Sequence, residues 1–269
     1  MTGPQRPQDP AGPGPADSAG VPWAGRTLLP NPFAADDGGR DELLAGALRA
    51  WAALDGGTAG AAVDPAGRLR AEQAVVAALA GTRLFAPVVA VLGEADPRPA
   101  GPAGDKSADM ALALLTRPDG RRALPLFTAV EALGRWRADA RPVPVDAARA
   151  ALSGVQERCE ALVLDPAGPV TFVVRRPALW ALARQEAWTP SPFDPEVAEG
   201  LRAGLGDLTA LRGVRCEAGE GAELRLVLGV APGLDRAALA ELTAEVGRRV
   251  AVLEVATRVD SLELRVLPA

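Results

Sequence analysis

Residues 109–127 run DMALALLTRPDGRRALPLF, two apolar stretches on either side of a turn sequence. The Pro-Asp-Gly triplet at 118–120 favours a turn because Pro fixes one backbone dihedral, Asp accepts from nearby backbone N–H groups and Gly tolerates a positive φ. The apolar residues on both sides suit strands. The stretch therefore predicts a β-hairpin with strands over 109–116 and 122–127.

Upstream of this hairpin, the spacing of apolar residues predicts two helices and a strand. Leucines at helical spacing precede and follow a Gly-rich connector at 55–67, and Gly81 lies where a helix C-cap belongs. The strand is expected over 84–91, with Pro87 removing one backbone donor and so favouring an edge or a bulge. The helical faces are formed by Leu44, Leu48 and Trp51, and by Leu69, Val76 and Leu79.

Downstream, Thr128-Ala129-Val130-Glu131 has the spacing of a capping box, in which the Thr hydroxyl and the Glu carboxylate each accept from the other residue's backbone N–H. The helix that it would begin carries Leu133 and Trp136. Alternating strand and helix patterns continue to about residue 184. They comprise strands over 141–145, 161–164 and 170–174, and helices beginning at Asp146 and at Pro177.

A proline-rich, non-periodic stretch at 185–193 has the character of an interdomain linker. The pattern restarts at 194, and the following residues predict the order αββαβ, a small two-layer unit. The expected fold class is α+β, with two mixed α+β domains at 41–184 and 194–269. Residues 1–40 are rich in Pro and Gly and are expected to form a disordered tail.

The tail contains one apolar patch in a stretch that otherwise has few large apolar side chains. We expect the patch either to dock on the folded body or to bind a partner. Its residues are Trp23, Leu28, Leu29 and Phe33.

Composition excludes several classes of chemistry. The chain of 269 residues has no His and two Cys, so mechanisms and metal sites that need imidazole are excluded, and so are zinc ribbons and disulfide frameworks. We expect no cofactor and no metal. The net charge of −5 argues against a nucleic-acid partner, because such affinity comes mainly from phosphate neutralisation. Cys159 and Cys216 are expected to be small core residues.

The location of the protein follows from its start and its apolar runs. Residues 1–5 lack the features of a signal peptide, and the longest apolar run, at 84–92, is about half the length of a membrane-spanning helix. We therefore expect a cytoplasmic protein that does not enter membranes.

Lys106 is the single lysine of the chain, beside Asp105 and Ser107 and close to Asp109. It is a candidate for an anion clamp or a tuned amine. The alternative is a solvated loop in which Lys106 pairs with a neighbouring Asp. The spacing S-x-x-K that would place a serine and a lysine on one helix face is not present here.

Arg135 and Trp136 form a second candidate, because arginines interleaved with an aromatic ring can bind phosphate or single-stranded nucleic acid. The alternative is that Trp136, at helical spacing from Leu133, belongs to the core with the arginines solvated at its rim. The acidic composition favours this second interpretation.

Several stretches together resemble the SseB-like family. They are VVAALAGTRLFAP at 75–87, DKSADMALALLTRPDGRRALPLFTAVEALGRW at 105–136, and ALVLDPAGPVTFVV at 161–174. The unit after the linker resembles the SseB C-terminal domain. The resemblance implies a two-domain α+β fold, and it favours a non-enzymatic role. The family name is linked to serine sensitivity and to type III secretion; this chain lacks the long apolar segments of a membrane-inserting translocator.

Two functions are compatible with these observations. The first is a non-enzymatic cytoplasmic module that binds a partner protein or itself through a face with Lys106, Asp109, Phe127, Arg135 and Trp136. The second is a sensor or enzyme for a small anionic ligand that uses Lys106 and nearby arginines. An enclosed polar pocket near Lys106 would favour the second, and an open apolar patch the first.

Overall fold

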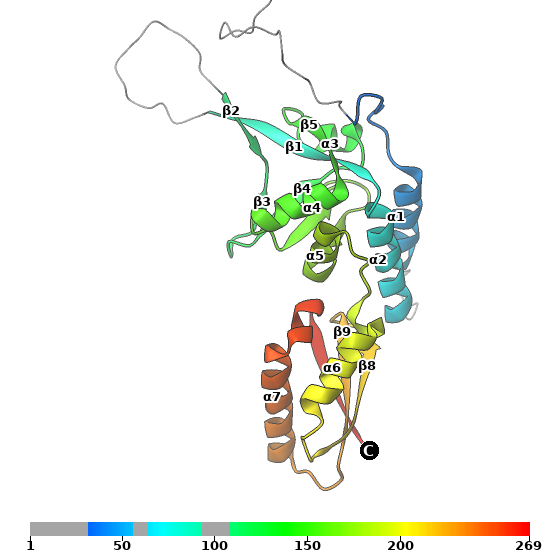
Figure 1. Ribbon diagram of the computed structural model, residues 1–269, viewed down its shortest axis with the longest axis vertical. Helices are drawn as coiled ribbons and strands as arrows, with labels where there is room; N and C mark the ends of the chain where they lie inside the picture. The colour runs from blue at the N-terminus through cyan, green and yellow to red at the C-terminus, as the bar shows by residue number, and fades with distance from the viewer. Residues whose placement is uncertain (1–31, 56–63, 93–107) are drawn as a thin grey trace, which may run out of the picture. The chain divides into compact units, whose positions relative to one another are not determined.

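The computed structural model describes residues 32–55, 64–92 and 108–269, without the side chains of 55, 90–92 and 108–110 (Figure 1). The predicted disordered tail, apart from its last residues, lies outside these ranges. Residues 38–269 form one compact unit. Within the described residues the chain is mixed α+β, which confirms the expected fold class.

The N-terminal module, residues 42–184, combines helices and strands. Its elements are α1 (Glu42–Asp55), α2 (Pro65–Leu79), β1 (Arg83–Leu92), β2 (Ala108–Leu112), β3 (Leu115–Thr116), β4 (Arg122–Leu126), α3 (Val130–Trp136), β5 (Arg141–Asp146), α4 (Ala147–Gln156), β6 (Ala161–Leu164), β7 (Phe172–Val174) and α5 (Arg176–Arg184).

The strands of this module form two sheets. One has the order β2-β1-β5 with antiparallel pairs, and the other the order β3-β4-β6-β7, in which β4 and β6 run parallel. A bridge between Phe85 and Phe127 connects the sheets. Because β4 and β6 are parallel, their carboxyl ends lie side by side, a place where α/β folds often gather polar side chains.

The predicted hairpin at 109–127 is present, but its first strand is divided between the two sheets. Residues 108–112 pair with β1, and only Leu115 and Thr116 pair with β4. The Ala113 N–H donates to the carbonyl of Pro87 at the break. The turn forms as expected, with the Gly120 N–H 2.9 Å from the Arg117 carbonyl oxygen and Gly120 at φ 83°.

Helices cover the second sheet and form the larger core of this module. Trp51 of α1 meets Phe172 of β7 edge-on, with ring centroids 5.0 Å apart. Ala150 and Gly154 of α4 are buried, so α4 lies close to α5 and to the sheet. Burying this many large side chains is the main source of stability. The cluster includes Leu44, Leu79, Leu124, Leu162, Leu164 and Leu179.

The C-terminal module, residues 194–269, has the predicted order αββαβ. Asp194 caps α6 by accepting from the Glu196 N–H, as the Asp-Pro sequence suggested. The helices α6 and α7 share one hydrophobic cluster with alternate residues of β9, so both cover the same face of a sheet ordered β10-β9-β8. The elements are α6 (Pro195–Leu205), β8 (Leu211–Ala218), β9 (Leu224–Val230), α7 (Arg236–Val252) and β10 (Leu262–Pro268).

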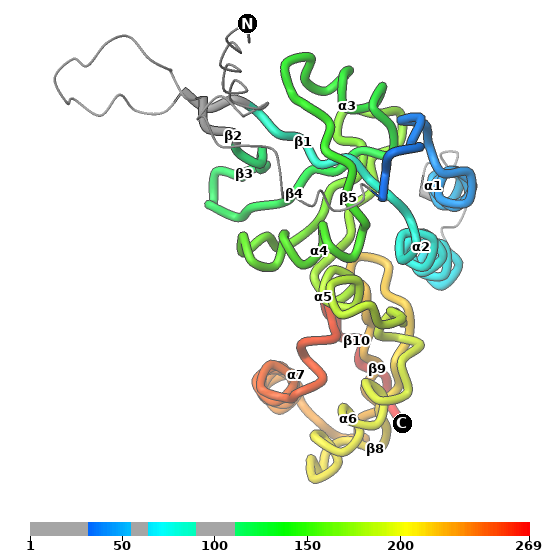
Figure 2. Tube along the Cα trace, turned by 45° about the horizontal axis from the view of Figure 1, so that its top comes forward, coloured from blue at the N-terminus to red at the C-terminus, as the bar shows by residue number. Residues whose placement is uncertain are grey.

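The predicted linker at 185–193 is held by hydrogen bonds to both modules. The side-chain amide of Gln73 in α2 donates to the Trp188 carbonyl at 3.2 Å. The Ser191 N–H donates to the Glu223 carboxylate at 2.8 Å, and Ser191 is fully buried in the short 3-10 helix η1 (Ser191–Phe193). The two modules therefore meet along a fixed connection, seen between α5 and α6 in Figure 2.

None of the helices in the described ranges combines the length and the apolar character that crossing a bilayer requires.

Candidate functional site

Of the site residues predicted from sequence, two have no described side chain. Lys106 lies outside the described residues. Asp109 is in β2, where its backbone pairs opposite Val91, and its side chain is not described. A role for Lys106 and Asp109 therefore stays a prediction.

The other three residues lie on or beside α3, and one of them corrects the expectation. Phe127 is 0% exposed, because it lies where the two sheets join and packs beneath α3, so it cannot form part of a binding face. Trp136 is partly buried and packs against it, with ring centroids 5.2 Å apart, which favours the core interpretation of Trp136. Arg135 is exposed and pairs with Glu131 at 2.6 Å, one helical turn away.

The predicted capping box at Thr128 is wrong. Ala129, not Thr128, is the N-cap of α3, and no side chain caps it. The Thr128 hydroxyl instead donates to Asp165 Oδ2 at 2.6 Å, and the Thr128 N–H donates to Asp165 Oδ1 at 2.9 Å. Thr128 follows β4 and Asp165 follows β6, so the parallel pair places both residues at one end of the sheet. Asp165 outcompetes Glu131 because it satisfies two donors within a buried site.

This buried pair is closed on its outer side by Arg40, whose Nε donates to the Thr128 hydroxyl oxygen at 3.0 Å. We call Arg40, Thr128 and Asp165 the strand-end cluster. Asp165 is 5% exposed and has φ 46°. All of its described contacts are internal hydrogen bonds and an ion pair, which is the character of a structural polar cluster.

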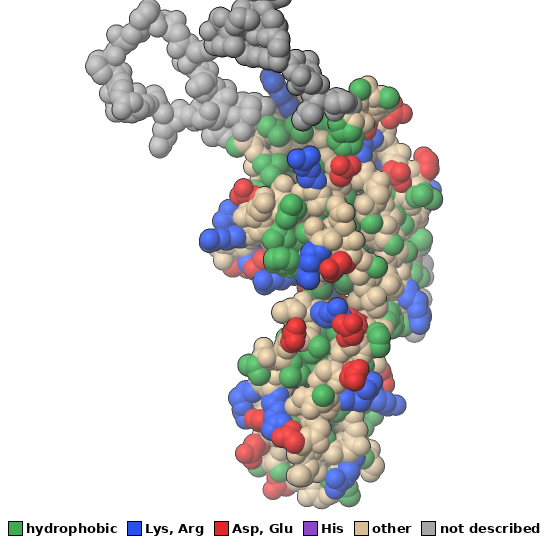
Figure 3. Space-filling model, in the orientation of Figure 1, with side chains coloured by type: hydrophobic (Ala, Val, Ile, Leu, Met, Phe, Trp, Pro, Cys, Tyr) green, Lys and Arg blue, Asp and Glu red, His purple; other side chains and the backbone are tan. Residues whose placement is uncertain are grey.

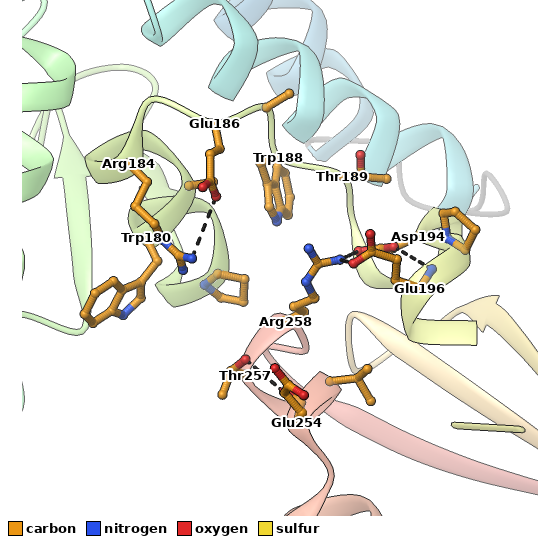
Figure 4. A pocket seen from close by; sticks show the side chains of 15 residues that line it. Trp180, Arg184, Glu186, Trp188, Thr189, Asp194, Glu196, Glu254, Thr257 and Arg258 are labelled. Carbon is orange, nitrogen blue, oxygen red and sulfur yellow. Dashed lines mark hydrogen bonds and ion pairs between the residues drawn. The ribbon is translucent and has the colours of Figure 1, made fainter. Parts of the chain in front are cut away.

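A cleft of about 670 Å³ lies where the two modules meet (Figure 4). One wall comes from α5 and residues 185–193, which we call the connecting segment. The other wall comes from the start of α6 and the 3-10 helix η2 (Glu254–Arg258). We call this the junction cleft. Clefts between structural units are common binding sites, because both sides can contribute to one ligand.

Tryptophan side chains lie in the middle and at the rim of the junction cleft. The indole of Trp188 points into its middle, and Trp180 lies at the edge with 38% exposure (Figure 4). The guanidinium of Arg184 lies 5.7 Å from the centre of the Trp180 ring. The Trp188 Nε1–H is shielded from solvent and has no acceptor among the described residues.

Charged side chains surround Trp188 on both sides. Arg258 contacts both Asp194 and Glu196 at 2.7 Å, and Arg184 lies 3.8 Å from Glu186. Four acidic and two basic side chains line the cleft, a net formal charge of −2. Figure 3 shows red and blue side chains interspersed where the modules meet and over the C-terminal module, so neither sign dominates that face.

Glycines in α6 bring η2 close enough to form the second wall. A Cβ atom at Gly200 would lie 2.6 Å from Val255 Cγ1, and one at Gly204 would lie 2.7 Å from Leu253 Cδ1. Side chains at these positions would push η2 away. The position of Arg258 and Glu254 therefore depends on small residues of the facing helix.

A smaller cleft, of about 530 Å³, lies between α2 and the β8–β9 turn. Its Glu72 is 8% exposed, and burial raises the pKa of this carboxyl although Arg175 and Arg68 oppose the shift. Glu223 is 3% exposed; burial raises its pKa against the backbone N–H groups of Ser191 and Asp260, which donate to it. Glu223 thus fixes the connection between the modules.

Both cysteines are free, and burial raises the pKa of each thiol. Cys159 is buried in the larger core, which confirms its predicted role, and Cys216 packs against the C-terminal cluster with partial exposure. A raised pKa keeps the thiol protonated and lowers its reactivity. Among the described residues, no group of three or more His, Cys, Asp or Glu is placed to hold a metal.

The junction cleft was not predicted, and its residues are far apart in sequence. Arg258 and Asp194 are 64 positions apart, and neither has a local pattern that marks it. A weak signal was available in the segment QEAWTPSPFDP at 185–195, where Trp188 directly precedes a proline-rich stretch expected to be a linker.

Residues 61–181 match the family model of the SseB protein N-terminal domain. No curated protein and no solved structure matches the chain. The match ends inside α5, so the resemblance of residues 194–269 to the SseB C-terminal domain stays a prediction. The matched range lies within the N-terminal module, so this module is identified as an SseB-type N-terminal domain.

Proposed function

We propose that the protein is a non-enzymatic, cytoplasmic interaction module that binds a segment of a partner protein in the junction cleft. The observation that carries this proposal is the exposure of Trp180 and the central position of Trp188 between charged side chains (Figure 4). Trp and Arg are the side chains most enriched at binding hot spots. The cleft offers both within one cavity.

The shape of the junction cleft favours an extended segment over a compact small molecule. Residues of the lining come from α5, the connecting segment, α6 and η2, so the cleft runs along the boundary of the modules. Its walls carry many exposed charges, such as Glu186 at 61% and Glu196 at 72% side-chain exposure. Small-molecule sites are usually more enclosed and more apolar.

A binding role for this cleft replaces the face proposed from sequence. Phe127 is buried and Arg135 is engaged by Glu131, while Lys106 is outside the described residues. The hypothesis of a small anionic ligand depends on Lys106 and therefore stays a prediction.

Site-specific photo-crosslinking tests the proposal. A crosslinking amino acid replaces exposed Ala187 in the cleft or, as control, Leu43 of α1, which is 81% exposed. In lysate of the source cells, position 187 should trap one protein that position 43 does not. The purified partner should then bind the full chain and bind Trp180→Ala at least about fivefold more weakly.

Equal products at both positions, or no product at 187, would contradict the proposal. A crosslinked product that contains a second copy of the chain would show that the cleft binds another copy of this protein and not a different partner.

A further inference from the structure

We infer that the segment bound in the junction cleft is cationic, an extended stretch with an arginine or lysine side chain that lies against Trp188 and Glu254. This inference rests on the proposed function and adds the chemical class of the partner. The ion pairs of the cleft, its aromatic side chains and the shielded Trp188 N–H support it.

The cleft has more carboxylates than guanidinium groups, so its ion pairs do not neutralise all of its negative charge. Arg258 is engaged by two carboxylates, those of Asp194 and Glu196, and Arg184 has Glu186 beside it. Glu254 lines the same cleft, and its carboxylate has no ion pair within the described part of the chain. An incoming anion would meet guanidinium groups that are already paired, whereas an incoming cation would find Glu254 and the second carboxylate on Arg258.

The aromatic side chains favour the same sign of charge. The face of an indole attracts a cation, most strongly among the aromatic side chains. This chain already uses such contacts, with guanidinium groups 4.2 Å from the Phe85 ring centre and 5.0 Å from that of Phe193. Trp188 lies between the two charged walls of the cleft (Figure 4). A basic side chain there can contact the ring and a carboxylate together.

The shielded N–H of Trp188 indicates that main chain accompanies the cation. Its Nε1 atom is buried and lacks an acceptor among the described residues, although a buried donor without a partner is costly. A carbonyl oxygen of an extended peptide would satisfy it once the indole turns its N–H toward the cleft. A free metal cation or a small ammonium ion would not, so a peptide fits the cleft better than a simple cation.

Exposure of the carboxylates sets the strength of binding. Glu196 is 72% exposed at its side chain, and Glu254 is also exposed. Exposed charge pairs contribute little each and are screened by salt. We therefore expect modest affinity that falls steeply as salt rises.

Calorimetry on the full-length chain tests the inference with three peptides of about twelve residues, equal in apolar residues and carrying Arg, Gln or Glu at the variable positions. The Arg peptide should bind at least about tenfold more tightly than the Gln peptide, and the Glu peptide should bind least. Raising the salt from about 0.05 M to 0.5 M should weaken the Arg peptide by at least about fivefold.

A matched pair of charge reversals locates the contact. Glu254→Arg should weaken the Arg peptide by at least about fivefold, whereas Glu157→Arg, an equal change of net charge at an exposed site in the N-terminal module, should change it by less than about twofold. Circular dichroism checks that both variants keep the fold.

Equal loss in both variants, tighter binding of the Glu peptide, or no binding of any peptide would overturn the inference. If position 187 still traps a partner protein in any of these cases, the proposed function holds and only the cationic class fails. If position 187 traps nothing while the Arg peptide binds as expected, the cleft selects cationic segments but the proposed binding of a partner protein fails.

Discussion

The strand-end cluster and the junction cleft are both polar sites that join distant parts of the chain, yet they differ in burial and in how their groups are satisfied. Asp165 is 5% exposed and each of its oxygens accepts a hydrogen bond from Thr128. In the cleft, Glu196 is largely exposed, and Glu254 is exposed without an ion pair among the described residues. A buried cluster whose groups are all satisfied therefore holds the fold, whereas incompletely paired charges at an open cleft are available for a ligand.

The largest effect is expected at the strand-end cluster. Asp165→Ala leaves two buried donors of Thr128 without an acceptor and places Ala at φ 46°. It should lower the free energy of unfolding by about 3 kcal/mol in urea denaturation. Glu131→Ala is the control, because the structure shows no capping box. It should cost less than about 0.5 kcal/mol, and a loss near 1 kcal/mol would restore the capping interpretation.

A second stability effect is expected at Glu223, which links the connecting segment to the C-terminal module. Glu223→Ala removes the acceptor for the Ser191 and Asp260 N–H groups. It should lower the free energy of unfolding by about 2 kcal/mol, measured by urea denaturation. It should also loosen the cleft, so hydrogen exchange over 186–194 should become faster. Unchanged hydrogen exchange over these residues would show that Glu223 does not hold the connecting segment in place.

Burial of the Glu72 carboxyl predicts that this group makes the fold less stable as pH rises. The pKa of Glu72 is raised above its ordinary value of 4.5, so the folded state holds its proton to higher pH than the unfolded state does. The contribution of this carboxyl to the free energy of unfolding is fully present below pH 4.5 and is lost as pH rises through the raised pKa.

Urea denaturation of the wild type and of Glu72→Gln at several pH values measures this contribution. The stability of the wild type relative to the variant should fall as pH rises from about 4.5 to 7. A difference that stays constant or grows over this range would show that burial does not dominate at Glu72.

The smallest effect is expected for Trp188→Phe, which keeps an aromatic ring and removes the N–H. Stability should be unchanged or slightly higher, because a buried donor without a described acceptor is removed. Binding of the Arg peptide should weaken by about two- to fivefold if a peptide carbonyl accepts from Nε1. Unchanged binding would show that the ring alone is used.

The sequence was sufficient where local chemistry decides. Pro118, Asp119 and Gly120 predicted the hairpin turn, and Asp194 with Pro195 predicted the start of α6 and of the αββαβ order. Apolar spacing also identified most helices, because their buried faces repeat at a regular interval.

Prediction failed where a distant residue competes with a local one. Thr128 has the local pattern of a capping box, but Asp165, 37 positions later, takes both of its donors. The strand at 109–116 is divided because each half pairs with a different sheet. The junction cleft depends on Arg258 meeting Asp194 across the modules, which no local spacing encodes.

A charge-swap measurement shows whether the junction cleft selects a cationic segment. Calorimetry compares the Arg and Glu peptides on the wild type and on Glu254→Arg. If the cation of the bound segment contacts Glu254, the variant should lose affinity for the Arg peptide and gain it for the Glu peptide, so that their ratio changes by at least about tenfold. The same ratio on both proteins, with the Glu157→Arg control unchanged, would show that the cleft does not select a cationic segment.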